Sequence, residues 1–130
     1  MQRLQSVDPA QAEGRAKELL DAVEAAFGAT PNAARLMANS PPVLDSFLAF
    51  SAAMSGAKIG AKLHNQIKLA TSEANACDYC TSLLCAIAPS AGTTAEDIVA
   101  GRAAASPNPR TDAALQFARA VLDTHGRVSE

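Results

Sequence analysis

The chain has 130 residues, a length typical of one soluble domain, and 48% of them are apolar while 18% are charged, which excludes a disordered or fibrous chain. The 11 Lys and Arg residues balance 13 Asp and Glu residues, giving a net charge of −2 without a basic cluster. This balance predicts neither a nucleic-acid partner nor an acidic membrane surface.

The apolar composition favours helices, because 30 Ala and 12 Leu stand against only 6 Val and 4 Ile. The first helix is predicted to start at Asp8-Pro9 and to end at Gly28. A second, short helix starts at Thr30-Pro31 and ends before Pro41-Pro42. The third runs on to about Gly56 and carries one inward stripe, formed by Val43, Leu44, Phe47, Leu48, Ser51 and Met54.

Similar signals for helix starts and ends recur in the second half of the chain. Helices are predicted over residues 60–75 and 77–88, and we expect them to form an antiparallel hairpin. Residues 93–96 fit a capping box for a sixth helix through Val99, residues 106–109 form a loop, and a seventh helix covers about residues 110–125. The residues expected to face inward are Leu63, Ile67, Ala70 and Ala74, then Cys80, Leu83, Leu84 and Ile87, then Leu115, Ala118, Val121 and Leu122. No segment alternates with period two, so we predict an all-α fold in a single domain over residues 1–130.

The sharpest chemical signal is the CxxC motif formed by Cys77 and Cys80. Two cysteines three positions apart at the start of a helix can close a small disulfide, and the amide dipoles there stabilise a nucleophilic thiolate. Two buried, unreactive cysteines remain an alternative. A c-type haem site is excluded because Thr81, rather than His, follows Cys80.

Zinc sites use the same cysteine spacing but need two further ligands. The candidates are Cys85, His64, His125 and scattered carboxylates, and they form no second close pair. We therefore expect neither a metal nor another cofactor.

Residues 72–80, Ser-Glu-Ala-Asn-Ala-Cys-Asp-Tyr-Cys, resemble the alkylhydroperoxidase (AhpD-like) branch of the carboxymuconolactone decarboxylase-like superfamily. Residues 7–9, 16–20, 31–32, 37–41 and 126–129 are also similar to peroxidase-related members, so the resemblance covers nearly the whole chain. It implies a helical fold with a CxxC hairpin, homo-oligomers that are often trimers or hexamers, and a dithiol that reduces peroxide or passes electrons to a partner. In the implied mechanism Cys80 attacks peroxide and becomes a sulfenic acid, while Cys77 donates a proton and resolves it to a disulfide.

The family mechanism also uses a Glu twelve positions before the first cysteine and a His four positions after the second. Here these positions hold Asn65 and Leu84, which we expect to lie opposite each other across the hairpin. Neither side chain can take a proton from a thiol. Glu73, four residues before Cys77, is the candidate replacement base, although a solvated carboxylate at a helix end is an equal alternative.

Other residues near the motif have simpler interpretations. We expect Cys85 to be a packed small hydrophobe rather than a third redox thiol, Asp78 to cap its helix, and Tyr79 to be half-buried or to line a thiol pocket. His64 is predicted to lie on the surface, and His125 suits a helix C-terminus.

The predicted function is a slow alkylhydroperoxidase-like dithiol oxidoreductase that acts on a peroxide or disulfide, with a possible protein thiol as electron donor. The alternative is a non-peroxidatic family member that serves as an oligomeric redox-sensing or interaction module. Lactone decarboxylation is weaker, because that chemistry needs no dithiol. Without an apolar run of about 20 residues or a signal-peptide pattern, we expect a cytoplasmic protein.

Similar proteins continue past residues 126–129 into further helices. We therefore expect this chain to lack C-terminal helices, to bear an apolar face on helices three to seven that a neighbouring subunit covers, and to hold an open dithiol.

Overall fold

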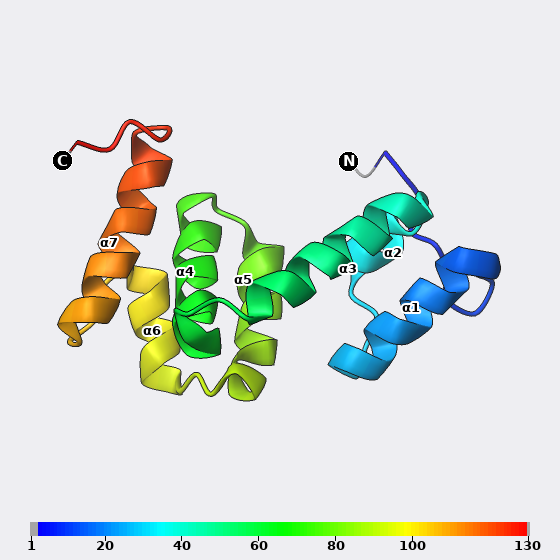
Figure 1. The fold of residues 1–130 in the computed structure, drawn as a ribbon, viewed down its shortest axis with the longest axis horizontal. Helices are drawn as coiled ribbons and strands as arrows, with labels where there is room; N and C mark the ends of the chain where they lie inside the picture. The colour runs from blue at the N-terminus through cyan, green and yellow to red at the C-terminus, as the bar shows by residue number, and fades with distance from the viewer. Residues whose placement is uncertain (1–2, 130) are drawn as a thin grey trace. The chain divides into compact units, whose positions relative to one another are not determined.

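A computed structural model describes residues 3–129, and every regular element within that range is helical (Figure 1). The predicted all-α class is thereby confirmed. The chain packs as two compact units that divide after Gly56. One domain over residues 1–130 stays a prediction. None of the helices in the described range combines the length and apolarity needed to cross a membrane.

The first unit consists of α1 (Gly14–Phe27), α2 (Asn32–Met37) and α3 (Pro41–Ser55). Leu19, Leu20 and Val23 point from α1 into a small core, which Leu44 of α3 completes. The predicted end of α1 is confirmed, because Gly28 adopts a left-handed conformation and its N–H bonds the Glu24 carbonyl.

The predicted start of the first helix is wrong. Asp8 and Pro9 begin a single turn, in which the Asp8 carboxylate accepts the Ala10 N–H and the Asp8 carbonyl accepts the Gln11 N–H. Gly14 then has a φ of 54°, in the left-handed region, where a right-handed helix cannot continue. The capping signal at Asp8 is thus satisfied locally, and α1 starts six residues later.

The predicted inward stripe of α3 is too wide. Leu44 is fully buried and Leu48 half-buried, but Val43 and Phe47 are exposed. Since α3 packs in this unit only along its contact with α1 and α2, a narrow i, i+4 strip is enough to close the core.

The second unit has α4 (Gly60–Ala74) at its centre, and α5 (Asp78–Ile87), α6 (Ala95–Ala103) and α7 (Pro109–Asp123) pack against it (Figure 1). A short 3₁₀ helix, η1 (Ala88–Ala91), follows α5. Because neighbours cover several sides of α4, its buried residues do not form the single predicted face: they are Asn65, Gln66, Leu69, Ala70 and Ser72. Of the four predicted residues only Ala70 is fully buried, and Leu63, Ile67 and Ala74 are half-buried.

The capping box of α6 lies one residue later than predicted. Thr94, not Thr93, is the N-cap, and Asp97, not Glu96, closes the reciprocal pair. The Thr93 hydroxyl is instead buried, with no hydrogen-bond partner among residues 3–129. Each of the two adjacent threonines has an acidic residue three positions later, so the sequence allows a capping box in either register.

Candidate redox site

The turn between α4 and α5 fixes where the cysteines emerge. The Ala76 N–H donates to the Glu73 carbonyl (3.0 Å), and the Cys77 N–H donates to the Ser72 carbonyl (2.9 Å). This is the bonding pattern of a Schellman motif, and Ala76 supplies its left-handed residue with a φ of 50°. The turn therefore ends α4 and places Cys77 at the N-cap of α5.

Cys77 and Cys80 form a disulfide, with their Cα atoms 5.3 Å apart. Both residues are half-buried. The Cys80 N–H donates to Cys77 Sγ (3.2 Å), so the sulfur satisfies one of the free amide groups at the start of α5. The N-cap is thus Cys77 itself and not Asp78, which occupies the first turn and was the predicted cap.

Glu73 lies in the last turn of α4, where its side chain is oriented by an ion pair. Arg102 Nε, from α6, donates to Glu73 Oε1, and the Glu73 side chain is 32% exposed. In the hairpin turn the Glu73 carbonyl accepts the N–H of Ala76, the residue before Cys77, while Arg102 directs the Glu73 carboxylate toward α6. The partner Arg102 was not identified from the sequence, because 29 residues separate the pair.

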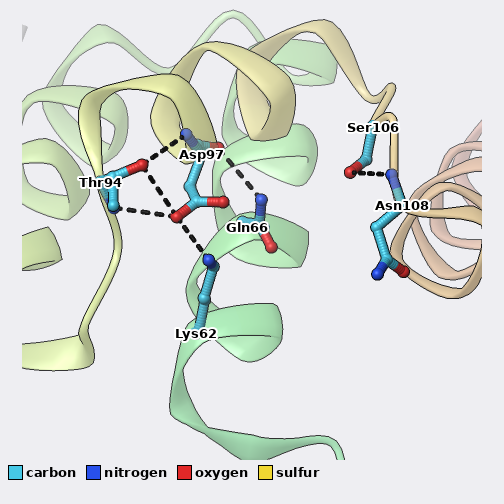
Figure 2. A network of polar contacts seen from close by, with 6 residues as sticks. All are labelled: Lys62, Gln66, Thr94, Asp97, Ser106 and Asn108. Atoms are coloured by element: carbon cyan, nitrogen blue, oxygen red, sulfur yellow. Dashed lines mark hydrogen bonds and ion pairs between the residues drawn. The ribbon is translucent and has the colours of Figure 1, made fainter.

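A polar cluster joins α6, the helix that carries Arg102, to α4 (Figure 2). Lys62 Nζ lies 2.7 Å from Asp97 Oδ2, and the buried Gln66 side chain donates to the Asp97 carbonyl (3.2 Å). The Thr94 N–H donates to the same carboxylate (3.0 Å). The hydrogen bonds from Lys62 and from the Thr94 N–H lower the pKa of Asp97. Sequence reasoning missed this cluster apart from the cap, since its members come from two helices.

The two positions at which the resemblance implies a proton relay, Asn65 and Leu84, are both buried. Gln66 and Glu73 of α4 face α6, so helical spacing puts Asn65 about 100° around the helix from Gln66, on the side left for α5. Leu84 is the one fully buried residue of α5, with 6% exposure, and Asn65 has 5%. Asn65 Oδ1 has no hydrogen-bond partner within the described residues. Neither of these two side chains can exchange a proton near neutral pH.

The remaining candidates lie around the site without joining it. Cys85 is a half-buried free thiol, and Tyr79 is exposed rather than half-buried. His64 is half-buried rather than on the surface, and burial together with the Lys68 charge lowers its pKa. His125 follows α7 in a left-handed conformation. Across residues 3–129, no three or more His, Cys, Asp or Glu side chains gather as a metal site would require.

An apolar groove of ≈ 470 Å³ lies between α4 and α7, on a different side of α4 from Asn65. The predicted inward residues Ile67, Ala118, Val121 and Leu122 line it instead of being sealed in a core. Ile59, Thr71, Ala114 and Phe117 complete the lining.

Comparison with known sequences adds one finding. The sequence model of the Carboxymuconolactone decarboxylase family matches residues 41–123, which run from the start of α3 to the end of α7 and include both cysteines. Neither the curated proteins nor the solved structures give a significant match.

Proposed function

The chain belongs to the carboxymuconolactone decarboxylase family, and we propose that it is a dithiol oxidoreductase that reduces peroxides or disulfides through Cys77 and Cys80. The observation that supports this proposal most directly is the cysteine pair at the N-terminus of α5, close enough to form a disulfide. In each cycle the dithiol gives two electrons to the substrate and becomes the disulfide, which a thiol donor reduces again. A reducing compartment, such as the cytoplasm, suits such a cycle.

We assign Glu73 as the carboxylate that accepts the thiol proton. It precedes Cys77 by four residues, across the turn that ends α4, and the ion pair with Arg102 of α6 orients its side chain while leaving it 32% exposed. Without the family's Glu and His at positions 65 and 84, we expect turnover to be slower by roughly a hundredfold or more than with an intact relay.

The test is a thiol count before and after oxidation. Reduced protein should show three free thiols, lose two on mild peroxide or on a small aromatic disulfide, and regain them with dithiothreitol. Cys85→Ala should lose both of its thiols in the same way, whereas Cys77→Ala or Cys80→Ala should not form the intramolecular disulfide. A thiol count that stays unchanged would contradict the proposal. Glu73→Gln should slow oxidation, with Asp123→Asn, from an exposed ion pair on α7, as the matched control.

A second candidate function follows from the buried Asn65 and Leu84, which remove the proton relay. In that case the chain is a non-peroxidatic, oligomeric module whose assembly responds to the redox state of the cysteine pair. We propose a homo-oligomer, a trimer or hexamer, in either case. Light scattering on reduced and oxidised protein separates the two functions: a change in mass without peroxide turnover favours the module.

A further inference from the structure

The two cysteines differ in their relation to the end of α5. The first amides of a helix have no intrahelical acceptor. One of them, the Cys80 N–H, donates to Cys77 Sγ, while the first regular bond of the helix runs from the Thr81 N–H to the Cys77 carbonyl. In the disulfide, Cys77 Sγ therefore occupies the place of a capping oxygen. A thiolate in this place accepts an N–H bond and lies at the positive end of the helix, and both interactions favour its charged form.

Cys80 lies inside the first turn, and the residue one turn beyond it is Leu84. Leu84 is buried and apolar, so it cannot take a proton from the Cys80 thiol as a histidine would. Two carboxylates belong to residues close to the pair in the sequence. Asp78 follows Cys77 on α5, and the Glu73 carboxylate of α4 is paired with Arg102 of α6. The N–H contact to Cys77 Sγ is therefore the feature that distinguishes the two sulfurs.

We propose that Cys77 is the attacking thiolate and Cys80 the resolving thiol, an assignment that rests on the proposed dithiol function and reverses the order implied by the family resemblance. With a disulfide substrate, Cys77 Sγ attacks one sulfur, forms a mixed disulfide and expels the other sulfur as a thiolate. Cys80 Sγ then attacks Cys77 Sγ, closes the Cys77–Cys80 bond and expels the second substrate thiolate. Two electrons pass to the substrate, and its two sulfurs take up the two protons that the dithiol loses.

With a peroxide, Cys77 Sγ attacks one oxygen and the O–O bond breaks. The departing alkoxide takes up the proton that the Cys77 thiol lost and leaves as an alcohol, and Cys77 becomes a sulfenic acid. Cys80 then attacks the Cys77 sulfur and water leaves. The electron count is the same, so both substrate classes put the initial bond on Cys77.

The experiment compares two proteins that each keep one cysteine, Cys80→Ala/Cys85→Ala and Cys77→Ala/Cys85→Ala. Replacing Cys80 by Ala leaves the backbone N–H that bonds Cys77 Sγ. With iodoacetamide at neutral pH, the protein that keeps Cys77 should be alkylated at least about fivefold faster than the one that keeps Cys80. Equal rates, or a faster reaction at Cys80, would overturn the assignment.

A second measurement avoids substitutions and any loss of folding they cause. Reduced wild-type protein is treated with less than one equivalent of iodoacetamide, and fragment-ion mass spectrometry locates the label among Cys77, Cys80 and Cys85. The first label should fall on Cys77, and a first label on Cys80 would refute the proposal. Alkylation requires no turnover, so it tests the assignment separately from the proposed function. If Cys77 is labelled first but peroxide and disulfides leave the thiol count unchanged, only the proposed function is contradicted.

Discussion

Gly101 marks a very close approach of α6 to α4, next to the arginine that holds Glu73. A methyl group added at Gly101 would lie 3.1 Å from Gln66 Cα, 3.2 Å from the Gln66 carbonyl oxygen and 3.3 Å from Leu69 Cβ. Two of these three atoms are backbone, so they cannot rotate away. Gln66 is further fixed by its hydrogen bond to the Asp97 carbonyl. Gly101→Ala can therefore fit only if the two helices separate by a few tenths of an ångström.

The sign of the stability change follows from two opposing effects. Replacing glycine by alanine inside a helix stabilises it by about 1 kcal/mol, whereas forcing an extra methyl group into a packed interface costs roughly 1–3 kcal/mol. Because the obstructing atoms are backbone, we expect the packing cost to dominate, with a net loss of about 1 kcal/mol. Gly101→Val adds two further carbons at the same contact and should cost about 3 kcal/mol.

Amide hydrogen exchange of α4 is the suitable assay, because the chain packs as two units and a global melting curve would mix them. Gly101→Ala should speed exchange of the protected α4 amides by about fivefold. Gly56→Ala is the control: its φ is −80°, and its nearest contact for a methyl group is the Ala53 carbonyl oxygen at 3.5 Å. That substitution should leave stability unchanged or raise it. Wild-type or slower α4 exchange in Gly101→Ala would refute the packing argument.

Three further variants test the turn, the polar cluster and the two implied relay positions. Lys62 and a backbone N–H lower the pKa of Asp97. The contribution of the Asp97 carboxylate to stability is therefore complete above about pH 4 and disappears as the pH falls through the lowered pKa. The Asp97→Asn variant should lose this acid dependence of stability in a circular-dichroism titration. Ala76→Gly should raise stability by about 0.5–1 kcal/mol, because a left-handed alanine is strained, and a lower urea midpoint would contradict this. Asn65→Glu with Leu84→His should raise peroxide turnover by about a hundredfold, while each single change should not; an inactive but folded double variant would show that these positions do not meet.

Local signals predicted most helix ends in this chain, and they failed where two signals competed. Gly28 and Pro41 mark real boundaries, because a left-handed residue and a missing N–H act on the chain whatever packs around it. Asp8 also carries a real capping tendency, but Gly14 confines it to one turn. Thr93 and Thr94 were equivalent in sequence, and the contact of Asp97 with Lys62 on α4 favours the later register.

The site divides in the same way between local and distant contributions. Cys77 and Cys80 were predictable because their chemistry depends on a spacing of three and on the start of a helix. The ion pair of Glu73 with Arg102 was not, since it depends on how closely α6 packs against α4 at Gly101. The left-handed Ala76 gave no signal either, because alanine is an ordinary helix residue and only the Schellman bonds show its role.

The N-terminus of α5 and the relay residues that the resemblance implies would activate different sulfurs. This difference bears on which class of substrate the chain reduces faster. In the proposed assignment the N-terminus of α5 favours a thiolate on Cys77, whereas the histidine that the family resemblance implies at position 84 would activate Cys80. When a disulfide is attacked, the leaving group is a thiolate, which is stable in water. Reduction of a disulfide therefore needs little beyond an attacking thiolate. When a peroxide is attacked, the leaving group is an alkoxide, which requires a proton while the O–O bond breaks. A chain that keeps the helix end but has Asn65 and Leu84 should therefore lose more rate with peroxides than with disulfides.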